Sequence, residues 1–187
     1  EDPQGAGFLL LSDIKGAALD LSSHATNTTE SSYYQLYKGL LDSNASFHLL
    51  VGDSYHDVHI IGICQDVLTD GGKAGLTFEM KNVCDTQVVP ASGRYGYNGS
   101  NLQTYLEGDF YGSLDARMRD ERVGIAGVTK RHQVNNSMTL QTAVYQHVFV
   151  PSFYEIFGVT RTSGGWNNAE NSSNSFQYQH FAKGGAN

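Results

Sequence analysis

The spacing of apolar and polar side chains predicts one helix, over residues 33–41. Within this stretch the apolar positions recur three and four residues apart, which places them on one face of two helical turns. Thr29 or Ser31 can cap the amino end, and the Asp-Ser-Asn run at 42–44 can end the helix. The apolar face consists of Tyr33, Leu36, Tyr37, Leu40 and Leu41.

The rest of the chain is patterned for strands. Residues 8–21 begin with an apolar run and alternate afterwards, which favours a strand. Similar runs between turn residues predict strands over 46–51, 56–65, 74–82, 86–89, 94–97, 103–111, 123–131, 137–150, 153–161 and 175–181. The sequence therefore predicts an all-β fold, a single antiparallel β-barrel or β-sandwich with one short helix. We expect one domain over 1–187, with a flexible arm at 1–7.

The composition agrees with strands joined by many turns. The 187 residues include 21 Gly, 17 Ser, 12 Asn and 12 Thr, together with 11 Tyr and 9 Phe. Charged residues make up only 17% and the net charge is −7, so the chain lacks the basic surface that nucleic acid or anionic lipid would need. We expect no nucleic-acid partner. We also expect no membrane span, because no apolar run reaches about 18 residues.

Cys64 and Cys84 are the two cysteines of the sequence. An even, low count in this composition is typical of one disulfide formed in an oxidising compartment. The bridge would join two neighbouring strands across a turn at 69–73, and two buried thiols are the alternative. The chain starts at Glu1 rather than Met, as a protein does after removal of a signal sequence and as any trimmed chain does. We therefore expect a location outside the cell or on its surface.

No sequence motif for catalysis is complete. The chain lacks a Gly-x-Ser-x-Gly elbow and a phosphate-binding loop. Glu107 and Asp109 would share one face of a strand, as the paired carboxylates of some glycosidases do, but the next carboxylate position is Gly112. A calcium-loop pattern that begins at Asp42 has Phe47 where the sharp turn needs glycine. We expect a protein that is not an enzyme and has no metal site.

A short run at the start of one expected strand concentrates possible cofactor ligands. Tyr55, His56, Asp57 and His59 bring a phenol, two imidazoles and a carboxylate into five residues. Imidazole and phenolate groups are axial ligands of haem iron, and a neighbouring polar group can orient them. Tyr55, His56 and His59 are therefore the candidate cofactor-binding residues, with haem as the candidate cofactor. The histidine pair with Asp57 could instead hold a transition metal. The alternative is a polar strand end with surface histidines.

Basic residues gather in one stretch of this acidic chain. Arg117, Arg119 and Arg122 lie close together, and Lys130 and Arg131 follow. Most such runs are solvated faces, here an exposed hairpin tip with its own salt bridges. The alternative is a docking surface through which Arg117, Arg119 and Arg122 bind an acidic protein partner.

One stretch resembles a known family. The run Leu106-Glu-Gly-Asp-Phe-Tyr-Gly112, then Ala116, then Val123-Gly-Ile-Ala-Gly127, resembles the closing hairpin of the β-barrel lobes of transferrin-binding protein B and its relatives. These are surface lipoproteins and secreted haemophores that capture haem or host iron carriers. The resemblance implies an eight-stranded barrel with an adjoining handle and no enzymatic activity.

Two functions follow as hypotheses. The first is a non-enzymatic extracellular or cell-surface binding protein that captures haem or a host iron-carrier protein. The alternative is a structural or adhesive subunit, either a lectin or a β-sandwich pilin or filament protein. A filament would assemble by donating the apolar segment 8–21 to the sheet edge of a neighbour.

Overall fold

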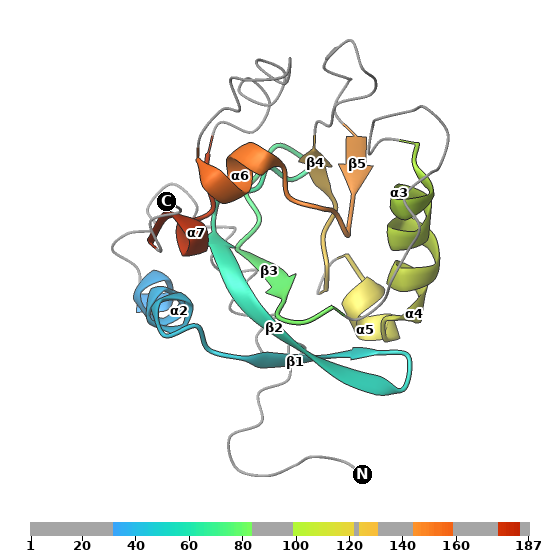
Figure 1. Cartoon of the computed structure of the whole chain (residues 1–187), viewed down its shortest axis with the longest axis horizontal. Coiled ribbons are helices and arrows are strands. Elements are labelled where there is room, and N and C mark those ends of the chain that lie inside the picture. Colours follow the sequence, from blue (N-terminus) through green and yellow to red (C-terminus); the bar gives the residue numbers. More distant parts are fainter. Residues whose placement is uncertain (1–31, 84–98, 122–123, 131–143, 159–175, 184–187) are drawn as a thin grey trace.

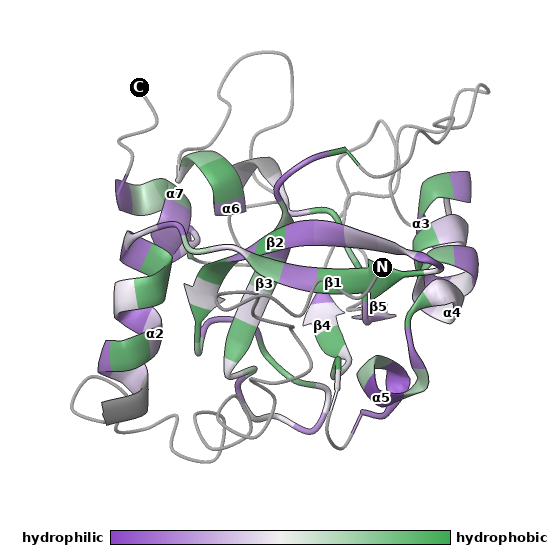
Figure 2. Ribbon diagram, turned by 90° about the horizontal axis from the view of Figure 1, so that it is seen from below, coloured by the Kyte–Doolittle hydropathy of each residue, from purple (hydrophilic) through white to green (hydrophobic). Residues whose placement is uncertain are grey.

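The computed structural model describes residues 32–83, 99–121, 124–130, 144–158 and 176–183. In this part of the chain two small antiparallel sheets lie between two groups of helices (Figures 1 and 2). The strands are β1 (Phe47–Val51), β2 (Ser54–Ile63), β3 (Leu76–Met80), β4 (Val128–Lys130) and β5 (Val144–Gln146). The helices are α2 (Ser32–Asp42), α3 (Asn101–Tyr105), the π-helix η2 (Leu106–Phe110), α4 (Tyr111–Ser113), α5 (Ala116–Arg119), α6 (Phe153–Phe157) and α7 (Gln179–Lys183).

The three-stranded sheet has the order β1-β2-β3. Phe47 of β1 lies opposite Val58 of β2, and β2 continues antiparallel to β3 with a register shift between Ile60 and Gly62. A Cβ atom at Gly62 would lie 2.8 Å from the ring of Tyr178. Gly62 therefore lets the segment before α7 pack directly onto the end of β2.

The two-stranded sheet β4-β5 is attached to the first sheet by the loop that follows β2. The Thr129 amide donates to the Val67 carbonyl at 2.9 Å, and Leu68 forms an isolated bridge with Val128. This pairing brings Asp66, just after β2, beside Lys130 at the end of β4.

The helix predicted over 33–41 is confirmed as α2. The strands predicted over 46–51, 56–65 and 74–82 are confirmed as β1, β2 and β3. Tyr37 and Leu41 of α2 are 3% and 1% exposed and belong to the same core as Phe47 and Leu49 of β1. Leu36, which the spacing placed on the buried face, is 56% exposed. The buried stripe of α2 is thus narrower than the sequence predicted.

The predicted all-β barrel or sandwich with one helix is wrong, because the described residues form two small sheets and several helices. The strand expected over 103–111 is helical, running through α3, η2 and into α4. Ser100 caps α3 by accepting the Gln103 amide at 3.1 Å. Leu102, Leu106 and Phe110 recur every four residues, a helical spacing that the strand prediction missed. The first part of the run that carries the barrel-family resemblance, residues 106–112, is therefore helical.

Two more segments that the sequence predicted to be strands form short helices instead. Within 153–161 the structure forms α6, which starts with a capping box: Ser152 accepts the Glu155 amide, and the Glu155 side chain accepts the Ser152 amide. Gly158 ends this helix in the left-handed region, at φ 66°. Residues 179–183, which overlap the strand expected at 175–181, form α7.

Several predictions concern segments beyond the described residues. The strands expected at 86–89 and 94–97, the arm at 1–7 and the segment 8–21 all lie there. Of the strands expected over 123–131 and 137–150, the described parts contain only β4 and β5. None of the described segments forms a helix that is long and apolar enough to cross a membrane.

Candidate functional site

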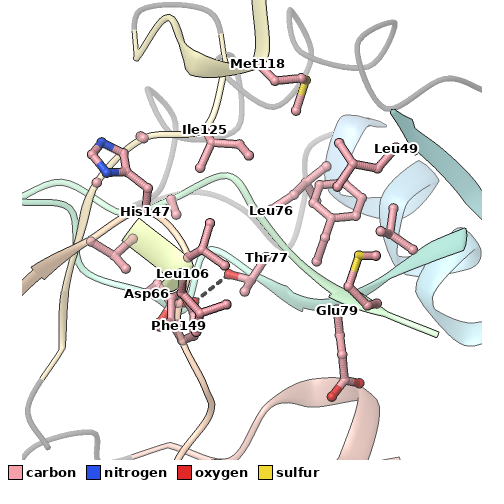
Figure 3. Close-up of a pocket in the computed structure, with 18 of the residues that line it drawn as sticks. Leu49, Asp66, Leu76, Thr77, Glu79, Leu106, Met118, Ile125, His147 and Phe149 are labelled. Carbon is pink, nitrogen blue, oxygen red and sulfur yellow. Dashed lines mark hydrogen bonds between the residues drawn. The ribbon is translucent and has the colours of Figure 1, made fainter. Parts of the chain in front are cut away.

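A cavity of about 910 Å³ opens between the two sheets and the helical segment α3–η2 (Figure 3). Its walls are mainly apolar and come from segments far apart in sequence. Figure 3 draws Leu76, Leu106, Ile125 and Phe149 around the space, with Met118 beyond Ile125. Polar side chains occur at a few places in this wall, among them Asp66, Thr77, Glu79, Lys81, Glu121 and His147.

His147 lies at the edge of this group (Figure 3). Its imidazole contacts the carboxylate of Glu107. The Glu107 carboxylate accepts from the amides of His147 and Val148 at 2.7 and 2.8 Å. Its other oxygen lies 3.1 Å from His147 Nδ1. Because an ionised carboxylate can only accept, this contact assigns a proton to Nδ1 and fixes the orientation of the ring.

Three further side chains surround the same imidazole. His147 Nε2 lies 3.0 Å from Glu121 Oε1 and 3.0 Å from the Tyr145 hydroxyl, which donates to Glu121 at 2.6 Å. Tyr111 stacks on the ring with centroids 4.3 Å apart. Glu121 and Tyr145 are largely exposed, at 56% for the Glu121 side chain and 42% for Tyr145. The Nδ1 side of His147 is thus fixed, whereas the groups at Nε2 are at the surface.

Burial, together with the carboxylates of Glu107 and Glu121, shifts the pKa values of the phenols around His147. Hydrogen bonds from Tyr145 and then His147 lower the pKa of Glu121. Loss of solvation, and next the hydrogen bond to Glu121, raise the pKa of Tyr145 to about 12. Burial, followed by the charges of Glu121 and Glu107, raises the pKa of Tyr111 as well. The phenols therefore stay neutral at physiological pH, and the chemistry available at this edge is that of an oriented imidazole.

A second polar cluster is buried around Lys130, and two of its members, Asp66 and Thr77, also line the cavity. The Lys130 ammonium donates to Asp66, to Glu155 at 2.6 Å and to the Tyr178 hydroxyl at 2.7 Å. Tyr178 and Thr77 donate in turn to Asp66, at 2.9 and 2.5 Å from its Oδ2 atom. Lys130, Asp66, Glu155 and Tyr178 are each at most 2% exposed. We call these four residues with Thr77 the Lys130 cluster.

All three ammonium protons of Lys130 have acceptors in this arrangement. Burial, and then the charge of Asp66, strongly raise the pKa of Tyr178, so that its hydroxyl remains a donor. The cluster joins the loop after β2, β3, β4, α6 and the segment before α7. The cluster therefore connects these five segments and stabilises their packing against one another.

The predicted haem ligands lie away from the cavity. Tyr55, His56 and His59 are on β2, and the described cavity wall contains none of them. Tyr55 is 42% exposed, and His59 is buried between Asn44 Oδ1, at 2.5 Å, and Glu79 Oε2, at 3.0 Å. Their role as cofactor ligands stays a prediction.

The first part of the basic run lies in the short helix α5. The prediction of an exposed hairpin tip there is therefore wrong. Arg117 and Arg119 are exposed on α5, which Asp115 caps, and Arg119 donates to the Leu114 carbonyl at 2.9 Å. Arg122 lies outside the described residues. A partner-binding role for Arg117, Arg119 and Arg122 stays a prediction.

The disulfide also stays a prediction. Cys64 directly follows β2, and Cys84 lies outside the described residues. The carboxylates of Glu107 and Asp109, expected on one face of a strand, lie instead in the π-helix, where Glu107 reaches His147 and Asp109 is exposed. Within the described ranges, no group of three or more His, Cys, Asp or Glu side chains is arranged to hold a metal ion.

Sequence reasoning missed both polar clusters. Lys130 belongs to a basic run and to the strand expected over 123–131, and His147 and Tyr178 belong to expected strands; the sequence predicts no functional role for any of the three. The capping-box pattern Ser152-x-x-Glu155 was a usable signal for the helix that carries Glu155. Nothing local identifies Asp66 as the partner of Lys130, because the two are 64 positions apart.

Residues 78–185 match the family described as "Domain of unknown function (DUF6273)". The match covers more than half of the 187 residues, and the chain belongs to this family. It includes His147, Lys130, Glu155 and Tyr178, whereas Asp66 precedes it. No curated protein matches the chain significantly. No solved structure does so either.

Proposed function

We propose that this member of the DUF6273 family is a non-enzymatic binding module that takes an apolar or amphipathic small molecule into the cavity. The observation that carries the proposal is the cavity itself, at about 910 Å³ with mainly apolar walls. Small-molecule sites are typically about 300–1,000 Å³, mostly apolar, with a few polar groups that orient the ligand. Composition and the predicted disulfide support a site of action outside the cell.

The walls favour a ligand with a broad apolar body. Aromatic residues Phe78, Tyr105 and Phe149 line the cavity together with aliphatic side chains. Polar groups on its lining, such as Lys81 and His147, can receive a polar or charged end of the ligand. A planar amphipathic molecule such as haem satisfies both requirements.

If haem is the ligand, the cavity favours His147 as the residue that binds iron. His147 is the one histidine in the described lining, and Glu107 orients its ring through Nδ1. Glu121 and Tyr145, which contact Nε2, are exposed side chains that can rotate towards solvent. The sequence-based candidates Tyr55, His56 and His59 form the competing ligand set.

The cavity proposal is tested by blocking the space. Binding of an anilinonaphthalene sulfonate dye is followed by fluorescence for the wild type, for Ala126→Phe in the cavity wall and for Ala116→Phe on exposed α5. We expect Ala126→Phe to weaken binding at least about tenfold and Ala116→Phe to leave it unchanged. Near-ultraviolet circular dichroism must stay native in all three, because such dyes also bind loosely packed states. Equal binding by both variants would refute the proposal.

Haem is tested separately by titrating haemin and recording the visible spectrum. If the cavity holds haem, His147→Ala weakens the Soret shift and His59→Ala does not. The reverse pattern would support the ligand set on β2. If the wild-type spectrum shows no shift, haem is excluded as the ligand, and the dye experiment still decides whether the cavity binds apolar molecules.

A further inference from the structure

The Lys130 cluster holds an ammonium group in contact with a carboxylate at a buried position. Lys130 Nζ touches Asp66 Oδ1, so the carboxyl carbon of Asp66 is one bond beyond the contact atom. Glu155 contacts the same nitrogen at 2.6 Å. The three side chains are at most 2% exposed. Reactive groups held this way react with effective molarities that reach about 10⁵–10⁸ M in well-oriented cases.

Aromatic rings cover the nitrogen on its remaining sides. Lys130 Nζ lies 4.0 Å from the ring centroid of Phe149, 5.2 Å from that of Tyr178 and 5.7 Å from that of Phe176. These rings exclude water from the contact between Lys130 and Asp66. The surroundings therefore disfavour hydrolysis and favour loss of a water molecule.

The buried charges of the cluster also favour loss of a water molecule. Two carboxylates and one ammonium are buried together, and burial of charge carries a large desolvation penalty. An amide between Lys130 and Asp66 replaces one positive and one negative charge by a neutral group. Glu155 then remains as a single carboxylate, whose Oε2 accepts the Ser152 amide at 2.7 Å.

We propose that Lys130 and Asp66 condense to form an intramolecular amide bond, with Glu155 as the proton carrier. Glu155 accepts a proton from the ammonium, and the freed electron pair of Nζ attacks the Asp66 carboxyl carbon. A C–N bond forms and the bond from this carbon to Oδ1 breaks. Two of the three ammonium protons leave with Oδ1 as one water molecule, and the third stays on the amide nitrogen. Glu155 ends as it began, and nothing is oxidised or reduced.

Hydrogen-bond donors at the second carboxylate oxygen of Asp66, Oδ2, can stabilise this step. Thr77 and Tyr178 donate to Oδ2 at 2.5 and 2.9 Å. Donors fixed in advance stabilise the negative charge that develops on such an oxygen during attack. Oδ2 becomes the amide carbonyl and keeps both donors. The bond would link the loop after β2 to β4 covalently, and unlike a disulfide it would resist reducing agents.

The test is the mass of the intact full-length protein after unfolding, reduction and alkylation. We expect a mass one water molecule below that of the sequence. Trypsin should release residues 39–73 joined to residues 123–131, because a linked Lys130 is no longer a cleavage site. The full sequence mass would overturn the proposal. So would a water loss confined to residues 39–73 with normal cleavage at Lys130, which indicates a cyclic imide at an aspartate of this peptide, such as Asp70 before Gly71.

Variants identify the roles of the residues. Lys130→Arg and Glu155→Gln should both restore the full mass, the first by removing the amine and the second by removing the proton carrier. Lys38→Arg, at a partly exposed position of α2, should leave the mass deficit unchanged. A deficit that persists in Lys130→Arg would contradict the assignment. If a variant fails to fold, the wild-type mass and peptide map still decide the question.

Discussion

Replacing Lys130 by Met should be among the most destabilising single changes in this protein. Met has similar length and no charge, so the variant keeps the volume of the side chain but leaves the carboxylates of Asp66 and Glu155 without their shared cation. Each carboxylate retains some donors, from Tyr178 and Thr77 to Asp66 and from Ser152 to Glu155. Neither has a remaining positive charge within the cluster.

Breaking a buried ion pair by removing one partner typically costs about 3–5 kcal/mol. The whole free energy of unfolding of a domain is about 5–15 kcal/mol, so this loss is a large share of it. At about 2–4 °C per kcal/mol for a chain of this size, the midpoint of thermal unfolding should fall by about 6–20 °C. An amide bond in the wild type would make the loss larger.

Chemical denaturation followed by far-ultraviolet circular dichroism measures this loss. Lys38→Met is the matched control, because Lys38 forms an ion pair with Asp42 at 2.7 Å but the two side chains are 33% and 45% exposed. Exposed pairs contribute about 0.2–1 kcal/mol, so the control should differ from the wild type by no more than that. If Lys130→Met unfolded within about 1 kcal/mol of the wild type, the Lys130 cluster would not stabilise the packing of the five segments as inferred from its contacts.

Three other changes probe the remaining contacts. Glu107→Ala should lower the free energy of unfolding by about 1–3 kcal/mol, because two backbone amides lose their acceptor, whereas Asp109→Ala, at an exposed position, should change it by less than about 0.5 kcal/mol. Loss of solvation and the hydrogen bond to Glu121 raise the pKa of Tyr145 from its ordinary value of about 10 to about 12, so the stability it contributes is present below about pH 10 and is lost as the pH rises to about 12. Tyr145→Phe should therefore show a shallower loss of stability over that range in a pH series of denaturation curves. Gln146 is fully buried and its amide has no partner among the described residues, so Gln146→Leu should leave the thermal midpoint unchanged or raise it.

The sequence predicted those parts of the fold whose pattern is local. The helix over 33–41 and the strands at 46–51, 56–65 and 74–82 form where the apolar spacing predicts them, although Leu36 of the helix is exposed. Over 103–111 two signals conflicted, because Tyr105, Phe110 and Tyr111 favour strands whereas the four-residue spacing of the apolar positions favours a helix. The structure follows the spacing, since it is the spacing that decides which side chains can be buried together.

The candidate site was much less predictable. His147 is held by a carboxylate 40 positions away, and Lys130 by groups 64, 25 and 48 positions away. Such contacts arise only when the loop after β2 pairs with β4, a pairing that leaves no local pattern. The clustered residues Tyr55, His56 and His59 were conspicuous in the sequence, yet proximity along a strand does not place side chains in one cavity.

The central claim, that the cavity takes up an apolar molecule, is tested most directly by methyl-group nuclear magnetic resonance during titration with the dye. Signals of Leu76, Leu106 and Ile125, which line the cavity, should shift together and saturate at one equivalent of dye. The signal of Leu36, exposed on α2, should stay in place. Shifts confined to exposed methyl groups such as those of Leu36, or no shift in the cavity signals at saturating dye, would contradict the account.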